Sequence, residues 1–131
     1  MKRHSRLQEL SREHHGALKL ARDAQRAADS GEPGRVATLA RRVVDLFGAE
    51  LDLHFRVEEQ GILVLLAQAG EPALVRRTLQ DHAELRRLAA VLAQPAADTL
   101  LRFAELLAAH VRFEERELFE AAQAHLDTEP A

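Results

Sequence analysis

Residues 54–63 read HFRVEEQGIL, and residues 110–119 read HVRFEERELF. Both segments follow the pattern H-x-R-x-E-E and end in an apolar pair. In an α-helix, residues four positions apart lie on the same face, so each segment places one imidazole beside one carboxylate. Around the first pair, Leu51, Ile62 and Leu65 fall on this same face. The pattern therefore predicts two helices that direct a histidine and a glutamate into an apolar interior.

Three groups of turn-forming residues divide the chain into four long segments. They lie at residues 30–34 (SGEPG), at residues 70–72 (GEP) and around Gln94-Pro95. Between them, apolar residues recur with helical spacing, and the third segment carries them at Leu79, Leu85, Leu88 and Leu92. Short turns between long helices make neighbouring helices antiparallel. We therefore expect an all-α fold, an up-down-up-down antiparallel four-helix bundle, with residues 1–131 as a single domain.

The composition excludes several classes of protein. The chain has no cysteine, which rules out disulfides, thiolate metal ligands and cysteine nucleophiles. No apolar run is long enough to span a bilayer, and no apolar stretch follows the basic N-terminus as it would in a secretory signal. The net charge is −3 with both signs interleaved, and no basic stripe tracks a nucleic-acid backbone. We expect a cytoplasmic protein that binds neither nucleic acid nor membrane.

Every expected helix carries at least one histidine on its apolar stripe. The candidate ligands are His14 or His15 in the first helix, His54 and Glu58 in the second, His82 in the third, and His110 and Glu114 in the fourth. In the first helix, the apolar stripe favours His14. His15 remains an alternative ligand, because it lies three positions before Leu18 just as His82 lies three positions before Leu85, and the two helices resemble each other. An acidic residue comes directly before the histidine in both Glu13-His14 and Asp81-His82.

The heights of these residues along the bundle agree with a common site. Glu58 and His82 are each twelve residues from Gly70, and His82 and His110 are thirteen and fifteen residues from Pro95. With a rise of about 1.5 Å per residue, antiparallel helices place both pairs level to within one turn. The second glutamates, Glu59 and Glu115, are turned about 100° from the stripe and are interpreted as solvated residues.

Buried carboxylates and imidazoles that converge in an apolar interior need a positive partner. A buried carboxylate alone costs several kcal/mol, on the order expected for an unpaired charge, so it either takes up a proton or binds a cation. Imidazole and carboxylate suit iron, manganese or zinc, and the lack of sulfur argues against softer metals. Two carboxylates among four imidazoles would let the glutamates bridge a pair of ions. The alternative is a metal-free bundle whose histidines are only hydrogen-bonded.

The segments REHHGAL, HFRVEEQGIL, QDHAELRRL and HVRFEERELF resemble the hemerythrin-like, HHE cation-binding family over nearly the whole chain. The resemblance implies a non-haem di-iron centre, with two iron ions bridged by an oxo or hydroxo group and by carboxylates. Glu58 and Glu114 would be the bridging carboxylates. The terminal ligands would be His14 or His15, His54, His82 and His110.

The chain departs from the family pattern at Arg86, and also at Val64 and Glu120, where the family often has proline. Oxygen-carrying members place a second histidine four residues after the third-helix histidine, and here that position is Arg86. This departure disfavours simple oxygen carriage. Gly61 lies on the ligand stripe, where a missing side chain could leave space for a small ligand or allow close helix packing.

The resemblance and the residues together predict a binding or sensing module rather than an enzyme. Its partner would be O2 or a related small oxidant, nitric oxide or peroxide, at the two-iron centre. The alternative is a di-iron enzyme, or an iron-handling or repair protein, that acts on peroxide or nitric oxide. A protein partner is compatible with both, and the sequence identifies none.

Overall fold

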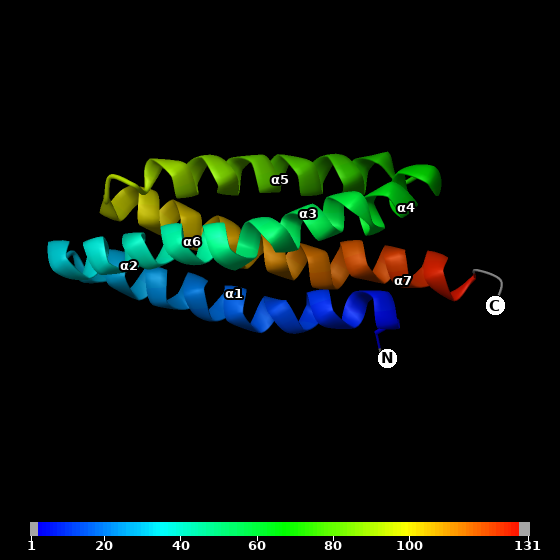
Figure 1. Ribbon diagram of the computed structural model, residues 1–131, viewed down its shortest axis with the longest axis horizontal. Coiled ribbons are helices and arrows are strands. Elements are labelled where there is room, and N and C mark those ends of the chain that lie inside the picture. Colours follow the sequence, from blue (N-terminus) through cyan, green and yellow to red (C-terminus); the bar gives the residue numbers. More distant parts are fainter. Residues whose placement is uncertain (1–2, 129–131) are drawn as a thin grey trace.

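The structure is a computed structural model that describes residues 3–128, and these residues form helices and turns without a strand. The helices form four runs, which cover residues 5–30, 33–68, 72–91 and 97–127. These runs lie side by side along the long axis of the molecule, and each run starts at the end where the previous one stops (Figure 1). The predicted all-α class is confirmed. The elements are α1 (Ser5–Ser30), α2 (Pro33–Leu46), η1 (Phe47–Leu51), α3 (Asp52–Gln60), α4 (Ile62–Gln68), α5 (Pro72–Val91), α6 (Ala97–Phe113), η2 (Glu114–Leu118) and α7 (Phe119–Asp127).

The turns between the runs use the residues that the sequence marks. Gly31 closes α1 with a φ of 67°, and Gly70 has a φ of 83° after α4. This left-handed backbone favours glycine because a Cβ would clash there. Pro33 and Pro72 then begin α2 and α5, where the missing amide proton costs nothing. The first two predicted turns are therefore confirmed, and the third spans the residues between Val91 and Ala97.

The second and fourth runs are not single α-helices. Each contains a turn of π-helix, η1 or η2, and Gly61 interrupts the second run with a φ of −113° and a ψ of −93°. A Cβ at Gly61 would lie 3.0 Å from the carbonyl oxygen of Val57, so this glycine permits a tight backbone contact. The expectation that Gly61 opens space for a ligand is wrong, because it meets backbone and lines none of the pocket described below.

The apolar interior is divided into two clusters along the long axis. One cluster includes Leu20, Phe103 and Leu107, and the other includes Leu7, Leu66 and Phe119. Between them lies a layer of buried histidine and glutamate side chains. Leu79, which the helical stripe placed in the core, is 44% exposed, so this one prediction of the stripe is wrong.

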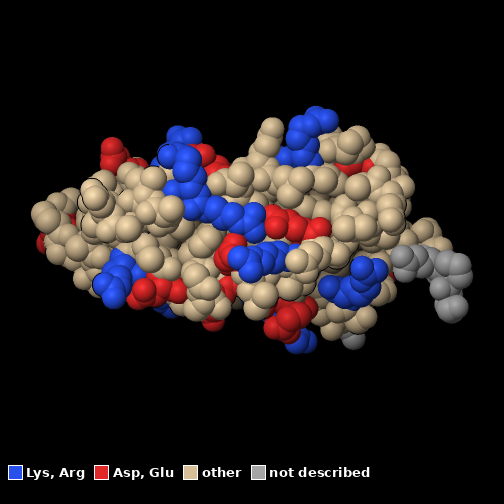
Figure 2. All heavy atoms as spheres, turned by 45° about the horizontal axis from the view of Figure 1, so that its top comes forward, with Lys and Arg blue, Asp and Glu red and all other residues tan. Residues whose placement is uncertain are grey.

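The surface carries both signs of charge in alternation. Figure 2 shows arginine and lysine side chains beside aspartate and glutamate side chains, with no field of a single sign on the face that it presents. Several of these are helical pairs of low energetic value, such as Arg87 with Glu84. Among the described residues, no helix is long and apolar enough to cross a membrane.

Candidate metal centre

Six ionisable side chains meet in the layer between the two apolar clusters. All six are at most 6% exposed. They come from four different helical runs, as predicted from the histidines and glutamates on the apolar stripe of each helix. The six are His14 of α1, His54 and Glu58 of α3, His82 of α5, His110 of α6, and Glu114, the first residue of η2.

The six side chains form two overlapping groups that share both glutamates. The first group is His14, His54, Glu58 and Glu114, and the second is Glu58, His82, His110 and Glu114. Within each group, one ligand atom of every residue lies within 4.8 Å of the others. Each group therefore offers two imidazole nitrogens and two carboxylate oxygens, a donor set of the kind that holds iron, manganese or zinc.

Each shared glutamate directs one oxygen toward each group. Glu58 Oε2 is 3.1 Å from His54 Nε2, and Glu58 Oε1 is 3.0 Å from His82 Nε2. Glu114 Oε1 is 2.8 Å from His14 Nε2, and Glu114 Oε2 is 3.0 Å from His110 Nε2. A carboxylate that faces two groups in this way is arranged to bridge two cations.

Several of these buried atoms make no hydrogen bond of suitable geometry among the described residues, although each lies within 3.1 Å of an imidazole nitrogen or a carboxylate oxygen. They are both carboxylate oxygens of Glu58, Oε2 of Glu114, and Nε2 of His82 and His110. A buried polar atom without a partner costs about 1–3 kcal/mol, and native proteins contain few of them. Cations between the two glutamates would satisfy all five atoms. The donor chemistry and the unpaired atoms thus fit a two-metal site.

An outer ring of four carboxylates holds the far side of each imidazole. The Nδ1 atom of His14 is 2.6 Å from Glu115, that of His54 is 2.7 Å from Glu13, that of His82 is 2.8 Å from Glu59, and that of His110 is 2.9 Å from Asp81. A carboxylate at Nδ1 fixes the tautomer that presents Nε2 to a metal and makes the imidazole a stronger ligand. The interpretation of Glu59 and Glu115 as solvated residues is therefore wrong.

The outer ring repeats between the two halves of the chain. Glu13 and Asp81 each precede a histidine in sequence but contact the histidine of the following run. Glu59 and Glu115 each follow a shared glutamate but contact the histidine of another helix, His82 and His14. The sequence contained the signal, since both pairs recur at the same place in each half. Their role became visible only when the helices were placed side by side.

Cations fix three of the four outer carboxylates. Arg86 binds both oxygens of Glu59, at 2.8 and 3.1 Å, and also contacts Asp52 at 2.8 Å. Arg77 contacts Asp81 at 3.2 Å, and Glu115 receives Arg3 and Ser11. Arg86 therefore holds the carboxylate that contacts His82, and it does not join the inner cluster itself.

Proton binding stabilises this cluster when no metal is present. Burial alone would lower the pKa of His54, but its contacts with Glu114, Glu58 and Glu13 raise it to about 11. The same competition between burial and carboxylates raises the pKa of His110 to about 9. Burial and the charge of Glu114 raise the pKa of Glu58. The imidazoles must give up these protons when a cation binds, so metal binding is linked to proton release.

The two histidine candidates of the first helix are separated by their positions. His14 is buried and belongs to the first group of four. His15 is exposed and belongs to neither group. The apolar stripe therefore placed the first-helix histidine better than the comparison with Leu18 did. The expectation of His15 as an alternative ligand is wrong in this structure.

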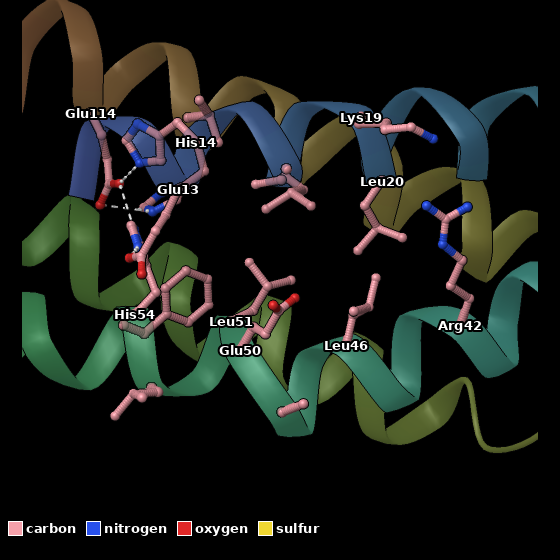
Figure 3. A pocket seen from close by; sticks show the side chains of 18 residues that line it. Glu13, His14, Lys19, Leu20, Arg42, Leu46, Glu50, Leu51, His54 and Glu114 are labelled. Atoms are coloured by element: carbon pink, nitrogen blue, oxygen red, sulfur yellow. Dashed lines mark hydrogen bonds and ion pairs between the residues drawn. The ribbon is translucent and has the colours of Figure 1, made fainter. Parts of the chain in front are cut away.

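A pocket of about 400 Å³ leads from the surface to the first group. In Figure 3, His14, His54 and Glu114 lie at one end of the pocket, and Lys19 and Arg42 lie at the other. Leu20, Leu46 and Leu51 line the space between these two ends.

Comparison with known families agrees with this geometry. The family described as the hemerythrin HHE cation binding domain matches residues 5–122, a span that contains all six inner side chains and all four outer carboxylates. Comparisons with curated proteins and with solved structures give no match. The chain belongs to the hemerythrin HHE cation-binding domain family.

Proposed function

We propose that the protein is a non-haem di-iron protein that binds or senses O2 or a related small oxidant, nitric oxide or peroxide. In this proposal, residues 1–131 form one up-down-up-down, hemerythrin-like bundle, located in the cytoplasm. His14 and His54 hold one iron ion, and His82 and His110 hold the other. Glu58 and Glu114 bridge the two ions.

One observation carries the proposal: each of the two buried glutamates directs its two oxygens toward two different pairs of histidines. A site for a single cation would need only one of these pairs. Iron fits the mixture of imidazole and carboxylate donors, and family membership supports a bound cation. Bound iron would supply the redox chemistry that small oxidants require.

The protein's own residues would prepare the site for such a ligand. The outer carboxylates would hold each imidazole in the tautomer that presents Nε2 inward. The apolar clusters on both sides would exclude water, which strengthens electrostatic interactions inside. With two imidazoles and two carboxylate oxygens, each ion would have four protein ligands. An iron ion with six positions would then keep open positions for an oxidant.

A second candidate, a di-iron enzyme or iron-handling protein that acts on peroxide or nitric oxide, is favoured by the pocket. The pocket leads to the first group, so a reactant could reach the proposed site repeatedly and its product could leave, as turnover requires. Exposing the reduced protein to O2 separates the two candidates. Reversible spectral change supports binding or sensing, and rapid irreversible oxidation supports turnover.

Metal analysis combined with a near-ultraviolet and visible spectrum tests the common part of both candidates. The chain has no Trp and no Tyr, so bands of bridged iron are free of protein absorption. We expect two irons per chain together with such bands. A colourless, metal-free and fully folded protein would contradict both candidates and support the hydrogen-bonded bundle.

The bridging role is tested with Glu58→Ala and Glu114→Ala. Each change removes a carboxylate that serves both groups, so we expect iron content below two per chain in both variants. Glu117→Ala is the matched control, because Glu117 lies in the same π turn as Glu114 but is exposed. Full iron occupancy in both test variants would remove the bridging assignment.

A further inference from the structure

The pocket beside the first group has walls that suit an uncharged organic molecule. Its interior is lined by Ala17, Leu20, Leu46 and Leu51 and is largely apolar. Its volume of about 400 Å³ corresponds to roughly a dozen water molecules at about 30 Å³ each. Water molecules find few hydrogen-bond partners in such an apolar space, whereas an apolar ligand of matching size is stabilised when it leaves bulk water.

The charged groups at the outer end of the pocket cancel one another. Lys19 and Arg42 supply two positive charges and Glu50 supplies one negative charge, while Glu13 lies at the inner end beside His54. Both cations also bind the same carboxylate, with Lys19 at 2.8 Å and Arg42 at 3.1 Å from Asp23 Oδ2. The outer part of the pocket therefore offers no excess charge to hold an anion or a cation.

The inner end of the pocket is polar and borders the proposed metal ligands. His14, His54 and Glu114 lie there, whereas His82 is shielded by Phe55, whose ring stacks on the imidazole at 4.0 Å. An entirely apolar ligand would remove water from these polar groups without replacing its hydrogen bonds. A hydroxyl or hydroperoxide oxygen at the inner end of the ligand would replace them.

The wall of the pocket contains a glycine that the helix geometry does not require. Gly16 lies inside α1, lines the pocket, and has no atom within 4 Å of an added Cβ. Its backbone is outside the left-handed region, which among the glycines is adopted by Gly31 and Gly70. An interior glycine weakens a helix relative to alanine, so neither packing nor backbone geometry explains its presence. The missing side chain does leave space in the pocket.

We propose that this pocket binds an uncharged organic molecule with an apolar body and a terminal hydroxyl or hydroperoxide oxygen, and that the missing side chain of Gly16 leaves space for it. The inference rests on the proposed function, because the oxygen end of the ligand would meet the side of the cluster that holds the first metal ion. Alcohols and organic hydroperoxides share this chemistry. Cumyl alcohol, which is stable toward redox reactions, is a suitable probe.

The test is an NMR titration of the full chain with cumyl alcohol, first without metal and then with zinc, a diamagnetic ion. We expect saturable shifts of the backbone signals of Ala17, Leu20 and Leu51 and of the His54 ring signals. Gly16→Leu should weaken binding by at least about tenfold, because the added side chain would occupy part of the pocket. Ala49→Leu, which adds bulk from η1, should act in the same direction and provides a second variant if the first fails to fold.

The matched control is Gly34→Leu, the same substitution at a helical glycine with open space around it and outside the pocket lining. It should leave the affinity for cumyl alcohol unchanged. No saturable shift at the pocket residues, or equal affinity in the wild type and both blocking variants, would overturn the inference. Metal content is measured on the same samples. Two metal ions per chain without probe binding would refute only the pocket, and probe binding without metal uptake would refute only the di-iron proposal.

Discussion

Replacing Glu115 by glutamine tests whether the outer ring of carboxylates controls metal binding. Glu115 lies 2.6 Å from Nδ1 of His14 and also accepts a hydrogen bond from Ser11 at 2.9 Å. Glutamine has nearly the same shape and keeps one acceptor oxygen, so Glu115→Gln removes the negative charge with little change in packing. We expect weaker metal binding, because the imidazole loses the charged partner that makes it a strong ligand.

The magnitude follows from the kind of hydrogen bond that is lost. A hydrogen bond to a charged group contributes about 1.5–3 kcal/mol, against about 1 kcal/mol for a neutral one. The difference of about 0.5–2 kcal/mol corresponds to roughly a two- to thirtyfold change in the dissociation constant. Loss of an outer partner of a ligating histidine typically costs about 10–100-fold in metal affinity. Because the side chain of Glu115 is 31% exposed, solvent screens its charge, and we expect an effect near the lower end, about tenfold.

The pH of the measurement matters because Glu115 also stabilises the proton that a metal must displace. Burial lowers the pKa of metal-free His14, but contacts with Glu114 and Glu115 outweigh burial and raise it. The substitution therefore weakens both metal binding and proton binding at His14. At neutral pH part of the loss in metal affinity is offset, and the full loss should appear at alkaline pH.

The assay is competition with a chelator for iron(II) without oxygen, using Glu117→Gln as the control. Glu117 lies in the same π turn, is exposed, and loses the same charge on substitution. The control should change the affinity by less than about twofold, as expected for a screened surface charge. Equal affinities for Glu115→Gln and Glu117→Gln at alkaline pH would refute the reasoning and reduce the outer ring to a surface feature.

Three further outcomes can be measured with the same preparations. Glu59→Gln should weaken metal binding more than Glu13→Gln in the chelator competition. Arg86 holds Glu59 in place at 2.8 and 3.1 Å, whereas the side chain of Glu13 is 46% exposed and its charge is screened by solvent. The reverse order of the two variants would contradict this explanation. In urea unfolding, the metal-free chain should lose stability as the pH rises from neutral through about 9 and about 11. The folded-state pKa values of His110 and His54 are raised from 6.5 to about 9 and about 11, so the stabilising protons are lost over this range. Constant stability between these pH values would disprove the shifts. The metal-loaded chain should respond in the opposite direction and release metal as the pH falls through the histidine range near about 6.5, which dialysis and metal analysis would detect; retention at about pH 4 would argue against histidine ligation.

The sequence predicted the inner cluster well because helical periodicity is a local property. Each candidate lies on a stripe of apolar residues in its own segment, and burying that stripe carries the imidazole or carboxylate inward with it. His14, His54, Glu58, His82, His110 and Glu114 are all buried as the stripes required. Glycine and proline at the turns determined where the runs reverse, since Gly31 and Gly70 adopt backbone angles that other residues avoid.

Helical periodicity predicts less wherever the backbone departs from a regular α-helix. The π turns η1 and η2 and the break at Gly61 insert extra residues into the second and fourth runs, and each changes the direction of the side chains that follow. A second gap concerns Glu59 and Glu115: an idealised rotation of about 100° per residue places them off the stripe but does not show that the histidine of another helix lies there. In the folded protein, both turn toward a neighbouring helix.

What the sequence determined by itself is which side chains enter the interior, since this depends on the spacing of residues within one helix. Only the tertiary structure decided which groups meet: that Glu13 holds His54 rather than its neighbour His14, and that Arg86 holds Glu59. It also placed His14 inside and His15 outside, and it opened the pocket beside Gly16. These contacts depend on the offset and rotation of one helix against another, which the packing of the whole bundle sets and no single segment encodes.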